Sequence, residues 1–71
     1  MKSRIADALL SDAARMVDSD LRWSLYVRAA IADLNALVHI PRTAPHVRKA
    51  LLDAAVAALE HAVDTQTEST Q

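Results

Sequence analysis

Between Ile5 and Ile40 no glycine or proline interrupts the chain, and apolar residues recur at alternating steps of three and four positions. This spacing places them along one side of an α-helix, in the a and d positions of a heptad pattern. We therefore predict a long helix over about residues 4 to 39. Its apolar seam consists of Ala6, Leu9, Ala13, Met16, Trp23, Val27, Ala30, Leu34 and Leu37, widened near its end by Ile31 and Val38.

Asp20 interrupts this seam at a position where Ala13 and Val27 predict an apolar residue. Asp18 and Ser19, just before it, are residue types that cap helix N-termini. The break near residues 18 to 20 has two interpretations: a helix that is continuous or kinked there, or two helices over about 4 to 17 and 20 to 39. Because neither glycine nor proline stands at the break, we expect the continuous or kinked helix.

The stretch HIPRTAPH, residues 39 to 46, holds both prolines of the chain. A residue before proline is disfavoured in the helical conformation, so the first helix should end near His39. A second helix follows over about 44 to 64, with Thr43 as its N-cap. Its apolar residues cover half of its circumference, which is too much for one neighbouring helix: Val47, Leu51, Leu52, Ala55, Val56, Ala58, Leu59, Ala62 and Val63.

A short connection between two helices predicts an all-α fold, an antiparallel helical hairpin that forms a single domain over residues 1–64. The polar residues 65–71 are expected to form a disordered tail. The second helix is too short to cover the first half of the seam, so we expect a second copy of the chain to cover it. The residues assigned to this homodimer interface are Leu9, Ala13, Met16, Trp23 and Val27.

Composition narrows the function classes. The chain has 71 residues and contains neither glycine nor cysteine, which excludes disulfides, thiolate metal sites and glycine-rich phosphate-binding loops. We do not expect an enzyme, because the sequence shows no nucleophile next to a base and no paired carboxylates, and two helices offer little concavity for a substrate. We also expect no cofactor and no small-molecule ligand. The charged N-terminal start and its short apolar run resemble neither a signal peptide nor a membrane span, so a cytoplasmic protein without a membrane partner is expected.

The three histidines do not suggest a metal site. His39 and His46 are seven residues apart across the proline bend, with no acidic residue between them, and His61 lies near the far end of the second helix. This spacing does not bring ligands together in the way a zinc site requires. We expect no metal and interpret all three as solvated residues near helix ends.

The basic segment around the bend raises a DNA-binding hypothesis. Residues 34 to 52 contain no acidic residue, and the run RTAPHVRKAL resembles the second helix of helix-turn-helix repressors of the GntR type. That resemblance implies that Arg42, Thr43, His46 and Lys49 face phosphates or base edges. The chain departs from the family in having a proline inside the supposed recognition helix and no room for a wing.

A ridge on the first helix suggests a protein-binding surface instead. Tyr26 lies off the apolar seam and four residues from Arg22, where a cation-π contact is expected. Aromatic residues and arginine are common at energetically dominant positions of interfaces. The residues assigned to this surface are Arg15, Arg22, Leu25 and Tyr26.

In size and alanine-rich helical pattern, as in VRAAIADLNALV and LLDAAVAALEHA, the whole chain resembles small phage-encoded all-α dimeric inhibitors of bacterial regulators, such as quorum-sensing anti-activators. The resemblance implies a homodimer that occupies the surface of a regulatory protein. The function expected is therefore a non-catalytic protein-interaction module that inhibits or modulates a regulator. The alternatives are a small DNA-binding regulator using residues 39–49 and a structural subunit of a larger assembly.

Overall fold

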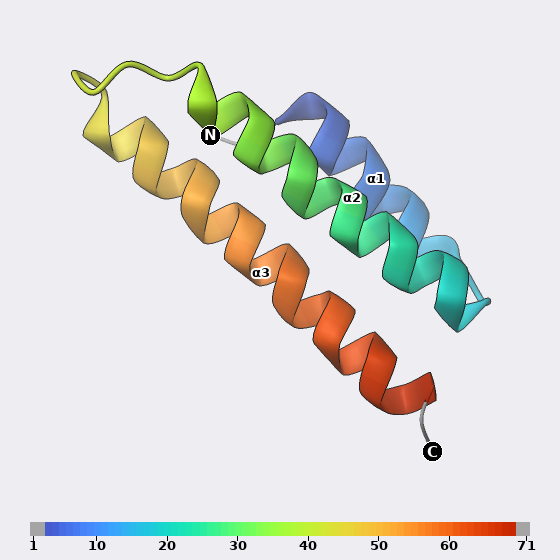
Figure 1. The fold of residues 1–71 in the computed structure, drawn as a ribbon. Helices are drawn as coiled ribbons and strands as arrows, with labels where there is room; N and C mark the ends of the chain where they lie inside the picture. The colour runs from blue at the N-terminus through green and yellow to red at the C-terminus, as the bar shows by residue number, and fades with distance from the viewer. Residues whose placement is uncertain (1–2, 70–71) are drawn as a thin grey trace.

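The computed structural model describes residues 3–69. Over this range the chain forms three α-helices and no strand: α1 (Arg4–Arg15), α2 (Ser19–Val38) and α3 (Pro45–Ser69). Figure 1 shows α2 and α3 side by side in opposite directions, with α1 lying along α2. The helix α2 is therefore the central element, and the Cα positions span 44 × 19 × 13 Å, which makes the molecule a thin slab.

The chain reverses direction between α1 and α2. The helix α1 ends at Arg15, Met16 is extended with φ −82° and ψ 124°, and α2 starts after Asp18 as its N-cap. An Oδ1 of Asp18 accepts hydrogen bonds from the backbone N–H groups of Asp20 at 2.9 Å and Leu21 at 3.1 Å. The expected continuous or kinked helix is thus wrong, and the alternative with two helices is confirmed. The cap satisfies N–H groups that a helix start leaves unpaired.

The start of α1 is attached to the middle of α2. The Ser3 hydroxyl accepts a 3.4 Å hydrogen bond from the N–H of Ala6, as an N-cap does. The backbone N–H of Ser3 in turn donates to an Oδ1 of Asp33 at 3.2 Å. Asp33 is fully buried in α2, and its charge lies near the positive end of the α1 dipole. This contact positions α1 against α2.

Alanines form the core between the three helices. The central cluster consists of Ala6, Ala29, Ala30, Ala55 and Ala58, with Leu9, Leu10 and Ala32 packed against it while partly buried. Ala13, Leu51 and Ala62 are also buried. Small side chains let helix backbones approach closely, but each alanine removes little apolar surface from water. The core is therefore close-packed and small.

Because α1 folds back on α2, the chain itself covers part of the seam that a second copy was expected to cover. Ala13 has 0% exposed surface, and Leu9 packs against the core cluster of its own chain. The assignment of Ala13 to a dimer interface is wrong, because an alanine without exposed surface cannot contact another molecule. Leu9 and Met16 are partly buried within the chain, and their assignment to a dimer interface stays a prediction.

The boundaries of α3 also differ from the expectation. The carbonyl of Ala44 accepts from the N–H of Arg48 at 3.1 Å, so Ala44 occupies the N-cap position expected for Thr43, and Pro45 is the first helical residue. Proline suits that position because its missing N–H has no helical partner there.

At its other end α3 continues to Ser69, so the expected disordered tail is wrong for residues 65–69. Thr65 is only 4% exposed, and its hydroxyl donates to the His61 carbonyl at 2.9 Å. Glu68 forms an ion pair with Arg22 of α2. The burial of Thr65 and the ion pair of Glu68 with the distant Arg22 stabilise the helix past its last apolar residue. Residues 70 and 71 lie outside the described range.

The alanine core predicts the effect of enlarging one side chain. Ala58→Leu should lower the free energy of unfolding by about 1 to 3 kcal/mol, because three extra carbon atoms do not fit between α2 and α3. Ala57→Leu, at the neighbouring exposed position, adds the same atoms to the same helix and should change stability by less than ~0.5 kcal/mol. Urea unfolding followed by circular dichroism measures both, and equal stability of the two variants would contradict the packing described.

Candidate functional site

Large apolar residues remain exposed along one side of α3. Leu52, Val56, Leu59 and Val63 recur at steps of four, three and four positions, which places them in one row along the helix. All four are exposed, and Val63 reaches 62%. Buried residues of the same helix, including Leu51 and Ala55, face α2. The prediction that the apolar half-circumference of this helix is too much for one neighbour is confirmed.

A matching row runs along α2. It consists of Trp23, Val27, Ile31, Leu34 and Val38, which fall within an arc of about 80° at 100° per residue. Val27 is partly buried, and the other four are exposed, from 38% for Leu34 to 79% for Val38.

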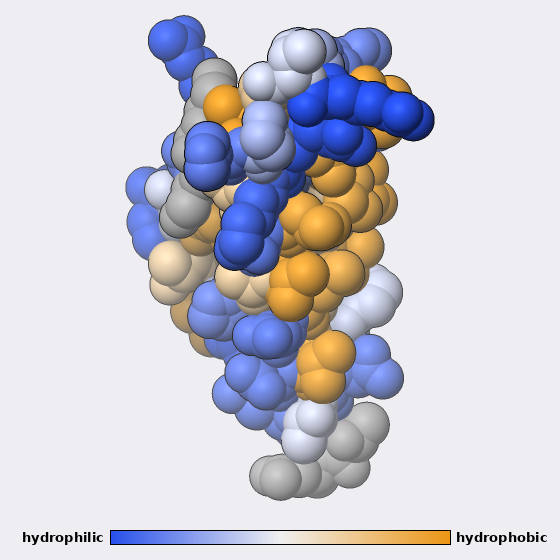
Figure 2. Space-filling model, turned by 90° about the vertical axis from the view of Figure 1, so that its left-hand side faces the viewer, coloured by the Kyte–Doolittle hydropathy of each residue, from blue (hydrophilic) through white to orange (hydrophobic). Residues whose placement is uncertain are grey.

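The two rows lie next to each other. Ala29 and Ala32, which join the core cluster containing Ala6 of α1, are roughly 150° around α2 from the row. Most of the row of α2 therefore points away from α1, and Ile31 lies at its edge, where it lines a pocket with Ile5 and Leu9 of α1. The antiparallel α3 presents its row on the same side. Figure 2 shows the hydrophobic residues gathered into one continuous area along a side of the slab. We call these nine residues the apolar face: Trp23, Val27, Ile31, Leu34, Val38, Leu52, Val56, Leu59 and Val63.

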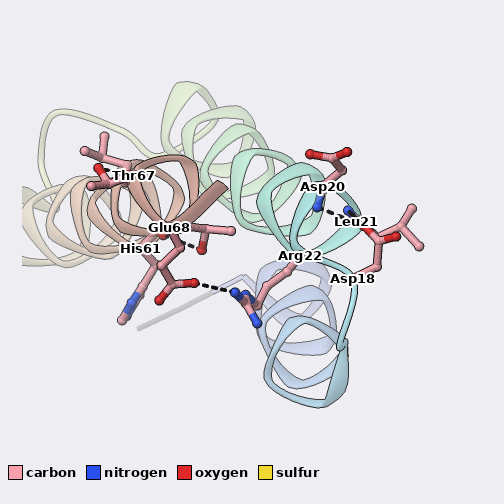
Figure 3. Close-up of polar contacts among 9 residues, drawn as sticks. Asp18, Asp20, Leu21, Arg22, His61, Thr67 and Glu68 are labelled. Atoms are coloured by element: carbon pink, nitrogen blue, oxygen red, sulfur yellow. Dashed lines mark hydrogen bonds and ion pairs between the residues drawn. The ribbon is translucent and has the colours of Figure 1, made fainter. Parts of the chain in front are cut away.

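A polar groove lies on the other side of the contact between α2 and α3. In Figure 3, Arg22 points from α2 toward Glu68 of α3, and the two form an ion pair of 2.6 Å between Nη2 and Oε2. The ring of Tyr26 stacks on His61, with 5.1 Å between centroids and 23° between planes. The groove is lined by Ala14, Arg22, Tyr26, His61, Asp64, Thr65 and Glu68.

The residues assigned to protein binding do not form one ridge. Arg22 and Tyr26 come together in the polar groove, but each contacts α3: the guanidinium of Arg22 binds Glu68, and the ring of Tyr26 stacks on His61. Leu25 is partly buried on α2. Arg15 belongs to α1 and pairs with Asp12 at 2.7 Å. Arg22 and Tyr26 therefore hold α2 and α3 together, a role that the sequence spacing did not indicate.

The basic residues assigned to DNA binding lie at one end of the slab. Arg42, Thr43, His46 and Lys49 are all exposed, in the connection between α2 and α3 and in the first turns of α3. Lys49 already has an anionic partner, because its Nζ lies 2.7 Å from an Oδ2 of Asp53, as the four-residue spacing predicts. The hydrogen bond and charge of Asp53 raise the pKa of Lys49. The positive charge that Lys49 brings to this pair is present below the ordinary lysine pKa and is lost as the pH rises through the raised pKa.

Metal ligands do not cluster in residues 3–69, where no group of three or more histidine or acidic side chains could hold an ion. His39 caps the end of α2, His46 is in the first turn of α3, and His61 is two-thirds of the way along α3. In the same range, every helix is too short or too polar to cross a membrane.

The apolar face overlaps only partly with the predicted dimer interface. Of the five residues assigned to it, only Trp23 and Val27 belong to the face. Two features of the sequence indicated other residues of the face. The seam of the first predicted helix widens at Ile31 and Val38, and apolar residues cover half of the circumference of the second.

The stacking of Tyr26 on His61 gives Tyr26 a structural role that can be measured. Tyr26→Ala should lower the free energy of unfolding by about 1 to 3 kcal/mol, since a partly buried ring and its stacking contact are lost. Tyr26→Phe keeps the ring and should retain most of that stability. Chemical denaturation of the two variants tests this, and wild-type stability in Tyr26→Ala would show that the ring contributes nothing to the contact between α2 and α3.

Comparisons with known protein families, with curated proteins and with solved structures found no match to this chain.

Proposed function

We propose that the chain is a non-catalytic protein-interaction module whose apolar face is covered by another protein chain. The observation that carries the proposal is the exposure of eight large apolar residues in two adjacent rows. Their exposed fractions amount to roughly 600 to 1,000 Å² if a fully exposed large residue presents ~150 to 250 Å². The largest apolar patch of a typical monomer is about 300 to 600 Å², and larger patches mark interaction sites.

The energetics favour association over exposure. At ~25 cal/mol per Å², covering the apolar face contributes on the order of 10 kcal/mol or more when the partner's surface is also apolar. That gain is comparable with the estimated cost of ~4 to 15 kcal/mol for lost translational and rotational freedom. Rigid helices also lose little conformational entropy on binding, because their backbone is already ordered. The finer proposal, that the module inhibits or modulates a regulatory protein, rests on its resemblance to small phage-encoded inhibitors.

A DNA-binding regulator is the second candidate. It is supported by the exposure of Arg42, Thr43, His46 and Lys49 at one end of the molecule, in a segment without acidic residues. DNA binding would leave the apolar face unused, and Asp53 already neutralises Lys49. The two candidates differ in salt dependence, because phosphate contacts weaken steeply with added salt and an apolar interface does not.

Site-specific photo-crosslinking tests the first candidate. The cross-linking residue p-benzoylphenylalanine replaces Val56 on the apolar face or Ala57 beside it, which is also exposed but on another side of α3. Irradiation in the producing cells should give a covalent protein adduct with the Val56 variant and little with the Ala57 variant.

The adduct also separates the candidates. A polypeptide attached through position 56, either another protein or a second copy, supports the proposal. Equal cross-linking at both positions, or no adduct at all, would contradict it. Salt-sensitive binding to random duplex DNA that is lost in Arg42→Ala/Lys49→Ala, together with no adduct at position 56, would establish the second candidate instead.

A further inference from the structure

We propose that the chain covering the apolar face is a second copy, paired face to face about a two-fold axis that lies in the interface and runs across the helices, so that the helices of the two copies are antiparallel. This inference rests on the proposed function, because it names the partner of the same surface. The support for a second copy is the opposite charge at the two ends of the face.

An acidic residue stands at one end of the apolar face. Asp20 lies seven residues before Val27, so its side chain is about 20° from Val27 around α2 and continues the same row. It is exposed, although it occupies a position of the apolar seam. Its backbone N–H is bound by the Asp18 cap, and the carboxylate itself is directed outward from the first turn of α2. Figure 3 shows Asp20 pointing away from α3 and the ion pair of Arg22.

A basic residue stands at the opposite end. Arg48 lies four residues before Leu52, so it continues the row of α3 by one turn, and it is exposed. The stacking of Tyr26 on His61 fixes the register of the two antiparallel helices. Five residues onward from Tyr26 and five back from His61, Ile31 and Val56 lie at about the same level along the two helices, halfway between the ends of the face.

The two charges are nearly equidistant from that middle. Asp20 is eleven residues from Ile31 and Arg48 is eight residues from Val56, or roughly 16 and 12 Å along the helix axes at 1.5 Å per residue. A two-fold axis in the interface, through the middle and across the helices, therefore brings the end of each copy that holds Asp20 over the end of the other that holds Arg48. A parallel pairing would instead place Asp20 opposite Asp20 and Arg48 opposite Arg48, which like-charge repulsion disfavours.

Other charges follow the same polarity. The end that holds Arg48 also carries Arg42 and Lys49 against Asp53, whereas Asp18, Asp64 and Glu68 accompany Asp20 against Arg15 and Arg22 at the other end, so the net charges of the two ends are opposite. The face is thus apolar in the middle and opposite in charge at its ends, which makes it complementary to itself in the antiparallel arrangement. Its exposed area also approaches the ~800 Å² that each partner contributes to a standard-sized interface.

Charge reversal tests the pairing on the full chain. Sedimentation equilibrium should show a dimer of the wild-type chain. Asp20→Arg and Arg48→Asp should each weaken dimerisation at least ~5-fold, because each creates two like-charge contacts across the two-fold axis. The double variant Asp20→Arg/Arg48→Asp restores both pairs with their signs exchanged and should recover most of the affinity. Arg4→Asp, at an exposed position of α1 away from the apolar face, serves as a matched charge-reversal control, and circular dichroism checks that each variant retains its helices.

Chemical cross-linking tests the orientation separately. The chain has no cysteine, so Asp20→Cys/Arg48→Cys introduces the only thiols. A short bismaleimide should link this double variant into covalent dimers and should leave Asp20→Cys alone and Arg48→Cys alone largely monomeric. Efficient linking of either single variant would reveal a parallel pairing and overturn the inference.

The outcomes distinguish this inference from the proposed function. A wild-type chain that stays monomeric into the high micromolar range overturns the second copy as the occupant, as does a dimer that Leu59→Asp leaves unaffected. In either case, photo-crosslinking of a different protein at position 56 would still support the proposed function. If that cross-linking also fails, both proposals are wrong.

Discussion

Close contact between alanines of α2 and alanines of its two neighbours is the constraint on which the other features of the molecule depend. Ala30 of α2 and Ala58 of α3 belong to a cluster in which no side chain is larger than a methyl group. The helices can therefore approach closely, but the core removes little apolar surface from water. Leu51 is buried, but most of the other leucines, valines and isoleucines stay partly or fully exposed, so the apolar face is a consequence of how the core is built.

The buried carboxylate of Asp33 fixes the position of α1 on α2. Asp33 is fully buried, and within the described residues one of its oxygens accepts from Ser3 while the other, Oδ2, has no hydrogen-bond partner. Burial of a charged group is costly unless it is compensated, and here the N-terminus of α1 supplies both a donor and a favourable dipole. The position of α1 thus depends on a polar contact as well as on Ala6 and Ala13. This contact keeps α1 on the side of α2 that leaves the apolar face open.

Local signals predicted the helical class, the proline bend and the capping potential of Asp18, because each depends on neighbours in sequence. The reversal at Met16 was not predicted, since the same apolar spacing suits a continuous helix. The contacts that favour folding back, the burial of Ala6 and Ala13 and the hydrogen bond of Ser3 to Asp33, are tertiary. The helical end of α3 was missed for a similar reason, because Glu68 is stabilised by Arg22, 46 residues away. Of the apolar face, the sequence pattern identified Trp23 and Val27 as interface residues. It missed the other face residues because the surface expected to contact a second copy was placed on the first half of the seam.

The central claim is that the alanine core is completed by association through the apolar face. It is tested most directly by measuring the thermal unfolding midpoint of the wild-type chain at concentrations from roughly 1 µM to 1 mM, because a folded state stabilised by association gains stability by mass action. If association through the apolar face completes the core, the midpoint rises steadily with chain concentration. A cooperative transition whose midpoint is the same across that range would show that the monomer is stable with its apolar face exposed, and would contradict the account.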